Sequence, residues 1–177
     1  MRMTAEQRRE QLLDATKAIV LAQGFHAVSI EAVAREAGIT RPIVYGHFDD
    51  LAGLLEALVD REALRALGQL PETYDDLLEA LTAYLHAVRS DPGTWRLVLM
   101  PQEGAPRLLG ERIAAGRAAV VERLAAALGP GTGLPDPELT AHMLRAYADE
   151  AARLVLEGYD VERILALTGF TLDKLAR

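Results

Sequence analysis

The residues best suited to chemistry are grouped in one short segment, between positions 40 and 47. Arg41 can donate two hydrogen bonds to O6 and N7 of a guanine, and Pro42 and Ile43 can contact the methyl group of a thymine. Three further side chains can donate hydrogen bonds to phosphate oxygens, namely Thr40, Tyr45 and His47. Together these residue types predict contact with a groove of double-stranded DNA.

Two short helices must position these side chains. Ser29 is a suitable N-cap for the first helix, whose apolar residues recur at helical spacing as Ile30, Val33, Ala34 and Ala37. Gly38 can adopt a positive φ and end this helix, and Thr40 can then cap a second helix, predicted from Arg41 to Phe48. Helices joined so tightly must cross steeply, which is typical of a helix-turn-helix.

The second helix has an inward and an outward face. Val44 and Phe48 lie four residues apart and predict the inward stripe. The outward face then holds Pro42, Ile43 and Gly46, flanked by Tyr45 and His47. An ordinary amphipathic helix with an exposed tyrosine would give the same pattern, so this octapeptide alone leaves both interpretations open.

A long helix is expected upstream of this pair. Thr4 followed by Gln7 predicts the start of this helix, and Gly24 predicts its end. Between them, apolar residues recur on one face of the helix. Phe25 and Val28 are apolar residues that can close the corner before the next cap. A three-helix unit over residues 1–50 results.

The motifs of this unit resemble those of the tetracycline-repressor (TetR) family of bacterial regulators. The shared features are the Gly-Phe step, the pattern Ser-Ile-x-x-Val-Ala-x-x-Ala-Gly-Ile and the run Thr-Arg-Pro-Ile-Val-Tyr-Gly-His-Phe before an acidic cap. The resemblance covers about residues 4 to 60. It implies base or groove contacts from Arg41, Pro42 and Ile43, and phosphate contacts from Ser29, Thr40, Tyr45 and His47.

One position departs from the family's pattern. The resemblance implies a lysine at the start of the fourth helix, where it pairs with a phosphate, but the chain has Leu51 there. Either the affinity for DNA is lower, or a basic group near the N-terminus substitutes, the candidates being Arg2, Arg8 and Arg9. A solvated helix start is the alternative interpretation of these arginines.

Composition is consistent with an all-α protein. The chain has 177 residues, of which 50% are hydrophobic and only 5% aromatic, enough to bury a sizeable core. It has no cysteine, so a disulfide scaffold or a thiolate metal site is excluded. No apolar stretch approaches the ~20 residues of a membrane span, and the N-terminus lacks the apolar core of a signal peptide. We therefore expect a soluble, cytoplasmic protein.

The formal net charge of −7 is unevenly distributed. Residues 1–50 carry six Lys or Arg and seven Asp or Glu, so most of the negative excess lies further along the chain. The DNA-facing portion is only locally basic. Weak nonspecific binding with a modest salt dependence is the expectation.

Residues 51–177 are predicted to form a helical ligand-binding and dimerisation domain, which brings the chain to about nine helices. The first helix of this part begins after Asp50 and runs to about residue 68. The segment 129–137 is the clearest linker. The helix after it is apolar on two sides, so one side can pack on its own domain and the other, with the last helix, on a second chain. Val155 and Leu167 are candidate interface positions, and a fully internal helix is the alternative.

A small-molecule pocket is expected between the helices of the second part. Its candidate lining residues are Tyr84, Val88, Trp95, Leu99, Met100 and Ile113. Possible polar partners are His86, Arg89, Arg117 and His142. Each of these residues can equally be plain core or surface, and the lining predicts only a largely apolar effector.

The sequence indicates neither an enzyme nor a cofactor. Its four histidines are far apart, so no metal site is signalled, and it has no Gly-rich phosphate loop or nucleophile motif. The leading hypothesis is a homodimeric transcriptional regulator, a repressor that a small-molecule effector releases from an inverted-repeat operator. A helical sensing module without specific DNA binding is the alternative, and activation in place of repression stays open.

Overall fold

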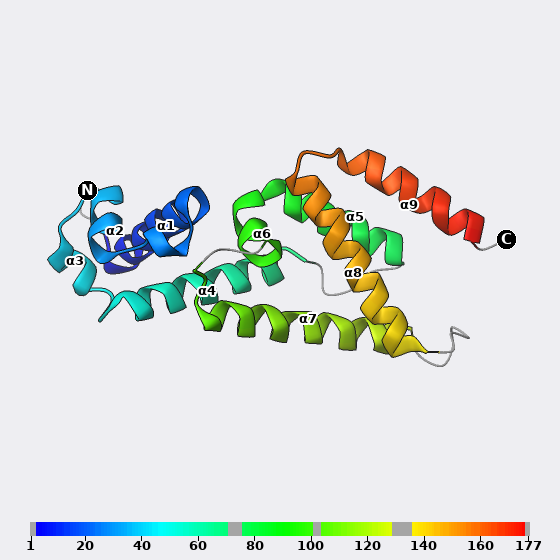
Figure 1. The fold of residues 1–177 in the computed structure, drawn as a ribbon, viewed down its shortest axis with the longest axis horizontal. Coiled ribbons are helices and arrows are strands. Elements are labelled where there is room, and N and C mark those ends of the chain that lie inside the picture. Colours follow the sequence, from blue (N-terminus) through cyan, green and yellow to red (C-terminus); the bar gives the residue numbers. More distant parts are fainter. Residues whose placement is uncertain (1–2, 71–75, 101–103, 129–135, 176–177) are drawn as a thin grey trace. The chain divides into compact units, whose positions relative to one another are not determined.

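The computed structural model describes residues 3–70, 76–100, 104–128 and 136–175, and within these ranges all regular secondary structure is helical (Figure 1). The all-α prediction is confirmed. The elements, in chain order, are α1 (Ala5–Gln23), the short 3-10 helix η1 (Phe25–Ala27), α2 (Ile30–Glu36), α3 (Arg41–Tyr45), α4 (Leu51–Gly68), α5 (Leu77–Ser90), α6 (Pro92–Leu99), α7 (Arg107–Ala127), α8 (Pro137–Leu156) and α9 (Val161–Leu175). Most of the segment 129–137, predicted as a linker, lies outside the described residues.

Side-chain caps fix where most helices begin. Thr4 and Gln7 form a capping box at the start of α1, in which each side chain accepts from the other residue's backbone N–H, at 3.1 and 2.9 Å. Asp50 Oδ1 accepts from Gly53 N–H at 2.8 Å and so caps α4. In four further caps a side-chain oxygen likewise accepts from the backbone N–H three residues later; these caps are Ser29, Asp76, Asp91 and Asp136. The caps at Thr4, Ser29 and Asp50 were predicted from the sequence, because a cap is a local interaction.

The recognition segment differs from its prediction at the C-terminal end. α3 ends at Tyr45, not at Phe48. The backbone N–H of His47 donates to the carbonyl of Val44, three residues back, at 2.9 Å, and Phe48 N–H donates to the same carbonyl at 3.0 Å, so the last turn is tighter than an α-helix. Gly46, a poor helix former, stands where the helix ends.

The chain divides into two compact units. The first holds the described residues of Met1–Leu64 and Pro101–Ile113, and the second those of Arg65–Met100 and Ala114–Arg177. Two of the three boundaries, after Leu64 and after Ile113, fall within long helices, so that α4 and α7 each contribute residues to both units. The boundary predicted after residue 50 divides a DNA-binding part from a ligand-binding and dimerisation part, and this functional division stays a prediction. By packing, residues 51–64 belong with the N-terminal helices.

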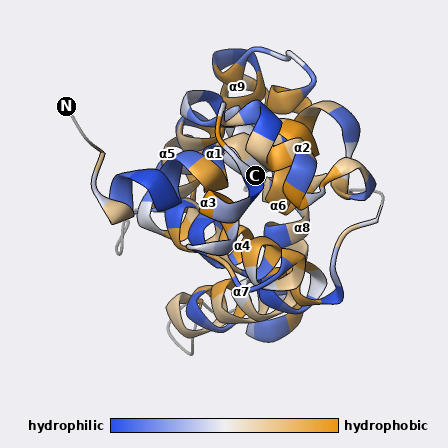
Figure 2. Ribbon diagram, turned by 90° about the vertical axis from the view of Figure 1, so that its left-hand side faces the viewer, coloured by the Kyte–Doolittle hydropathy of each residue, from blue (hydrophilic) through white to orange (hydrophobic). Residues whose placement is uncertain are grey.

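In the first unit, α1 packs against η1 and α2, and α2 packs against α3. Its most deeply buried apolar side chains, each at most 1% exposed, are Leu12, Leu13, Val20, Val33, Val44, Leu54 and Leu58. The helices are amphipathic, with hydrophobic and hydrophilic residues on different sides (Figure 2). Burial of one apolar face per helix therefore holds the unit together.

An ion-pair network joins α1 to α4 beside this apolar core. Glu62, 2% exposed, accepts from Lys17 Nζ at 2.6 Å and pairs with Arg61 at 2.8 Å. Arg61 also contacts Glu10 at 3.0 Å and Asp14 at 2.8 Å. Burial alone would lower the pKa of Arg61, but attraction to Glu62 and hydrogen bonds to its carboxylate partners leave that pKa raised. Because a buried carboxylate is costly unless paired, Glu62 fixes the register of the two helices.

A segment from the middle of the chain also packs into the first unit. Gly104 has a φ of +71°, and a Cβ there would lie 3.2 Å from the backbone nitrogen of His26. Arg112 Nε donates to Asp60 Oδ1 at 2.8 Å and so ties α7 to α4. This docking has no local signal in the sequence, because it joins residues about fifty to eighty positions apart.

The second unit is built on α5, which packs against α6, α8 and α9. Its main core is formed by Leu81, Leu85, Val88, Trp95, Leu99, Ala151, Ala152, Leu156, Val161 and Ile164, together with further buried alanine side chains. Ala151 and Ala152 present little side chain, so α8 comes close to its neighbours. A smaller cluster joins α7 to α8 through Val121, Leu128 and Ala141.

Glycine substitutions test the docked segment. Gly104→Ala should lower the free energy of unfolding by at least about 1–2 kcal/mol, since alanine is strained at positive φ and its Cβ meets His26. Urea denaturation of the full chain measures this. Gly110→Ala is the matched control: it lies in α7 with nothing near its Cβ position, so it should be neutral or stabilising by roughly 0.5–1 kcal/mol. Equal effects of the two substitutions would contradict the docking.

Candidate nucleic-acid interface

The outward side of α3 is the face predicted to meet DNA. Ile43 is 41% exposed and Tyr45 49%, whereas Val44 is fully buried and Phe48 is 6% exposed. Six of the seven predicted contact residues are exposed, namely Ser29, Thr40, Arg41, Pro42, Ile43 and Tyr45, and His47 is half-buried. The structure thus brings the predicted set together on the α2–α3 segment, as the spacing of Val44 and Phe48 requires.

Two hydroxyl groups stand at the helix starts of this face. The Ser29 hydroxyl accepts from Ala32 N–H at 3.1 Å, which leaves its own hydrogen free to donate. Thr40 occupies the N-cap position of α3 but makes no side-chain capping hydrogen bond, so its predicted role as a side-chain cap is wrong. Pro42 within the first turn lacks an N–H that a cap could serve. The exposed Thr40 hydroxyl therefore keeps its hydrogen-bonding capacity.

The turn between α2 and α3 is as tight as predicted. Gly38 has a φ of +67°, and Ile39 N–H donates to the carbonyl of Ala34 at 2.9 Å. Gln11 of α1 donates to the carbonyl of Ala37 at 3.0 Å, so the end of α2 is also held from outside. The angle between α2 and α3 is thereby fixed by glycine geometry and by one long-range hydrogen bond.

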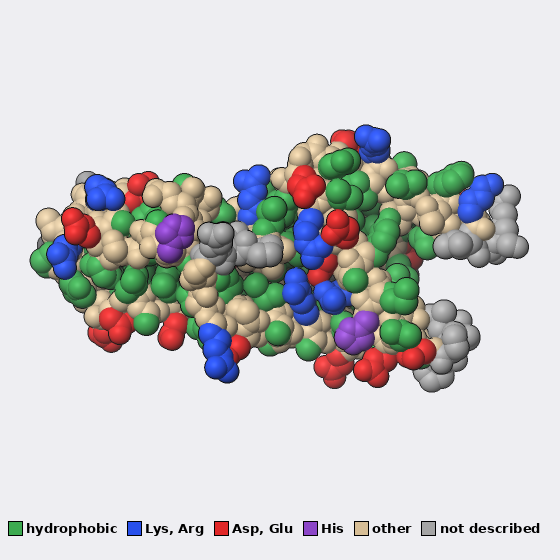
Figure 3. All heavy atoms as spheres, viewed as in Figure 1, with side chains coloured by type: hydrophobic (Ala, Val, Ile, Leu, Met, Phe, Trp, Pro, Cys, Tyr) green, Lys and Arg blue, Asp and Glu red, His purple; other side chains and the backbone are tan. Residues whose placement is uncertain are grey.

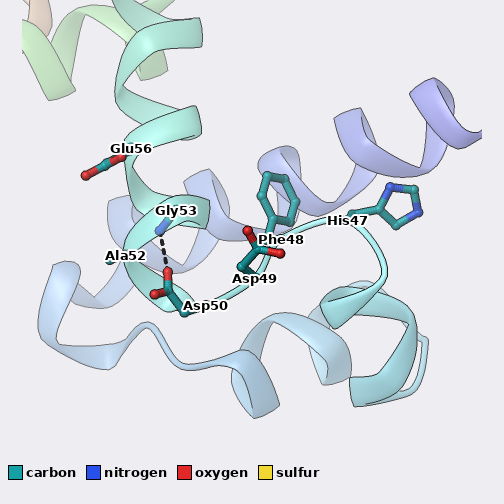
Figure 4. A pocket seen from close by; sticks show the side chains of 7 residues that line it. All are labelled: His47, Phe48, Asp49, Asp50, Ala52, Gly53 and Glu56. Carbon is teal, nitrogen blue, oxygen red and sulfur yellow. Dashed lines mark hydrogen bonds between the residues drawn. The ribbon is translucent and has the colours of Figure 1, made fainter.

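A shallow hollow lies at the corner between α3 and α4 (Figure 4). It is lined by His47, Phe48, Asp49, Asp50, Ala52, Gly53 and Glu56. Asp50 is engaged as the cap of α4, and three carboxylates in all border the hollow. This corner is acidic, although it adjoins a face predicted to meet phosphates.

Most of the predicted effector-pocket residues lie in one cluster of the second unit. Val88, Trp95 and Leu99 are buried in its core, and Tyr84 and Met100 pack against them. The rings of Tyr84 and Trp95 meet edge to face, with centroids 5.0 Å apart. Ile113 is the exception, because it belongs to the first unit. Its helical spacing on α7 did not reveal that this end of the helix packs elsewhere.

A polar cluster borders these aromatic rings. Tyr84 Oη donates to Asp149 Oδ1 at 3.4 Å, and the same carboxylate is paired with Arg145 and lies 3.5 Å from Arg117. Burial, and then the negative charge of Asp149, raise the pKa of Tyr84 well above its usual value. Trp95 Nε1 donates to Gln69 Oε1 at 2.9 Å. Two of the residues predicted to line a pocket, Tyr84 and Trp95, therefore have polar neighbours.

Sequence reasoning found only part of this cluster. Arg117 was predicted as a polar partner, but Asp149 and Gln69 were missed. The spacing of Asp149 four residues after Arg145 was the one available signal. Two other candidates, His86 and Arg89, contact each other at 2.7 Å, and His142 is exposed.

Apolar side chains remain exposed on α8 and α9, where hydrophobic side chains are visible on the surface (Figure 3). They are Leu139, Met143 and Tyr147 of α8 and Leu167, Phe170 and Leu172 of α9, between 47% and 67% exposed. We call this set the α8–α9 surface. Val155, predicted as an interface position, instead packs against the core of the second unit.

Among the described residues, no group of three or more His, Cys, Asp or Glu side chains could hold a metal ion. No helix within these ranges is long and apolar enough to cross a membrane.

Comparison with known proteins agrees with this geometry. Residues 12–58 match the family described as bacterial regulatory proteins, tetR family. Among curated relatives, the transcriptional activator FasR of Mycolicibacterium smegmatis is 27% identical over 55% of this chain and 48% of its own length. The transcriptional regulator BetI of Yersinia pestis is 44% identical over 35% of this chain and 31% of its own length. The chain thus spans half or less of the length of these relatives.

Solved structures are similar over most of the chain. A TetR-like transcriptional regulator from Rhodococcus sp. RHA1 has a TM-score of 0.76 at 25% identity, covering 94% of this chain and 93% of its own. NalD of Pseudomonas aeruginosa, described as the secondary repressor of a multidrug efflux pump, has a TM-score of 0.68 at 22% identity, covering 91% and 93%. The latter likeness concerns the fold alone.

The fold and the exposed face of α3 define a helix-turn-helix protein followed by a helical second part. The comparisons make the family specific: residues 12–58 match the TetR family of bacterial regulatory proteins, and the chain is similar in structure to a TetR-like regulator over most of its length.

Proposed function

We propose that this protein is a DNA-binding transcriptional regulator that acts as a homodimer on an inverted-repeat operator. The observation that carries this proposal is the one-sided exposure of α3, where Val44 is fully buried and Ile43 and Tyr45 face solvent. A helix held in this way can enter a major groove with its polar and apolar side chains already placed. Because a bacterial operator lies in the cytoplasm, we propose that compartment for the protein.

Base reading and backbone positioning are assigned to different residues. Arg41 supplies the bidentate contact to a guanine, and Pro42 and Ile43 contact thymine methyl groups. Phosphate oxygens accept from Ser29, Thr40, Tyr45 and His47, which set the register of α3 but carry no sequence information.

Dimerisation through the α8–α9 surface supplies the second recognition helix. Six large apolar side chains exposed on adjacent helices are a costly surface for a monomer, and a second copy of the same surface covers them in a four-helix arrangement. Two recognition helices held at a fixed spacing of ~34 Å, or a multiple of it, reach successive faces of the major groove. The operator therefore has two-fold symmetry.

We further propose repression that a small, largely apolar effector relieves. Support comes from the aromatic pair Tyr84 and Trp95 within the apolar core of the second unit. The curated relatives include an activator, FasR, so a reporter gene placed behind the operator decides the sign of regulation.

The acidic corner favours a second candidate, a sensing module without specific DNA binding. Leu51 stands at the start of α4 where a cation would help, and Asp49, Asp50 and Glu56 border the same corner. Selection of duplexes from a random pool at low salt discriminates the two. Enrichment of an inverted repeat supports the regulator, and the absence of any enriched symmetric sequence supports the sensing module.

Arg41 is expected to set base preference. Arg41→Ala should relax selection at one base pair per half-site at a cost of ~1–3 kcal/mol, because a guanine loses its bidentate partner. Tyr45→Phe, which removes only a phosphate donor, should weaken all duplexes similarly. Binding to the selected operator and to its single-base variants measures both. Unchanged discrimination in Arg41→Ala would show that another residue reads the base.

Dimerisation is expected to depend on Leu167, which is 64% exposed on α9. Leu167→Glu should give monomers that lose operator binding with the helix-turn-helix intact, since a charge would have to be buried between subunits. Sedimentation and operator titration test this. Leu64→Glu is the matched control, because Leu64 is 72% exposed on α4, outside the α8–α9 surface. If the Leu167→Glu variant still sediments as a dimer, dimerisation does not use this interface.

Effector binding is expected to be reported by Trp95, the only tryptophan in the chain. An apolar compound that quenches its fluorescence should lower operator affinity several-fold to over a hundredfold, a coupling of ~1–3 kcal/mol, and operator DNA should weaken that compound's binding equally. If quenching leaves operator affinity unchanged, the core around Tyr84 and Trp95 is not the regulatory site.

A further inference from the structure

The corner where α3 meets α4 poses an electrostatic problem for DNA binding. His47, a proposed phosphate contact, lies at this corner together with Asp49, Asp50 and Glu56 (Figure 4). A phosphate that approaches His47 meets carboxylates of like charge, which weakens the contact at low and moderate salt. A cation held at the same corner would offset this repulsion.

Arg9 of α1 is placed at this corner. Its guanidinium carbon lies 5.0 Å from the centroid of the Phe48 ring, within the range of a cation–π contact. Phe48 is 6% exposed and is the next residue after His47. Because the ring is fixed in the core, it holds the guanidinium against the residue that directly follows His47 in the chain.

The other cations of α1, and Arg61 of α4, have partners within the protein. Lys17 pairs with Glu62. Arg61 pairs with Glu62, Glu10 and Asp14. Arg8 donates a hydrogen bond to Gln11. For Arg9, no carboxylate within ion-pair distance is found in the part of the chain that the structure describes, although Phe48 covers one face of its guanidinium. Its N–H donors are therefore available to an external acceptor.

We propose that Arg9 is a positioning residue for DNA, which donates to a backbone phosphate next to the one bound by His47. This inference rests on the proposed operator binding and extends it to α1, a helix outside the helix-turn-helix. A planar guanidinium stacked on a ring is already restricted in orientation, so little further side-chain entropy is lost when it binds a phosphate. The contact adds affinity for any sequence and no base preference.

Arg9→Met tests the proposal with little change in packing, because methionine covers an aromatic ring without a charge. Operator affinity should be measured over a range of salt concentrations, on the selected duplex and on a scrambled one. The slope of log K against log[salt] should fall by about 1 per subunit, with both duplexes weakened by a similar factor. Arg8→Met is the matched control at the adjacent position, and its slope should stay near that of the wild type.

A second variant separates charge from folding. Leu51→Lys, added to Arg9→Met, places a cation at the first residue of α4 and should restore the lost salt slope. A wild-type slope in Arg9→Met, an equal loss in Arg8→Met, or no restoration by Leu51→Lys would each overturn the proposal. If the wild type itself selects no duplex, the proposed function fails instead, before Arg9 is tested.

Discussion

The burial of two side chains, Val44 and Phe48, is the constraint on which the rest of the DNA-binding surface depends. α3 has only five residues, and a helix this short is not stable alone in water. Its position comes from these two anchors and from the tight turn at Gly38. Since both anchors lie on one side, Arg41 and Tyr45 are directed outward by the same packing that stabilises the helix.

Further contacts within the first unit hold the helices that pack around α3 in place. Gln11 holds the end of α2, and the network around Glu62 holds α4 against α1. Residues 51–64 thus pack with the N-terminal helices, although they follow the helix-turn-helix in sequence. The helix α4 belongs to the first unit as far as Leu64 and to the second from Arg65.

Local signals explain why much of this could be read from the sequence. The caps at Thr4, Ser29 and Asp50, and the positive φ of Gly38, are determined by residues within a few positions of each other. The end of α3 at Tyr45 was missed because the last turn tightens at Val44, whose carbonyl accepts from both His47 and Phe48.

Contacts between distant residues leave no periodic signal, which is why the rest could not be predicted. Three features depend on how distant elements pack. They are the docking of Gly104 on His26, the grouping of Arg117 with Asp149, and the position of Ile113 in the first unit, apart from the other predicted pocket residues. The sequence did suggest that a basic residue near the N-terminus could replace a cation at Leu51, but only the contact with Phe48 distinguishes Arg9 from Arg8.

Dimethyl sulfate protection of guanine N7 tests the central claim most directly, because this reagent attacks the atom that Arg41 is proposed to cover in the major groove. With the full chain bound to its selected duplex, one guanine in each half-site should be protected symmetrically, and Arg41→Ala should expose both while bound at a higher protein concentration. Protection that persists in Arg41→Ala, or a bound duplex with no protected guanine in the wild type, would contradict the placement of α3 in the groove.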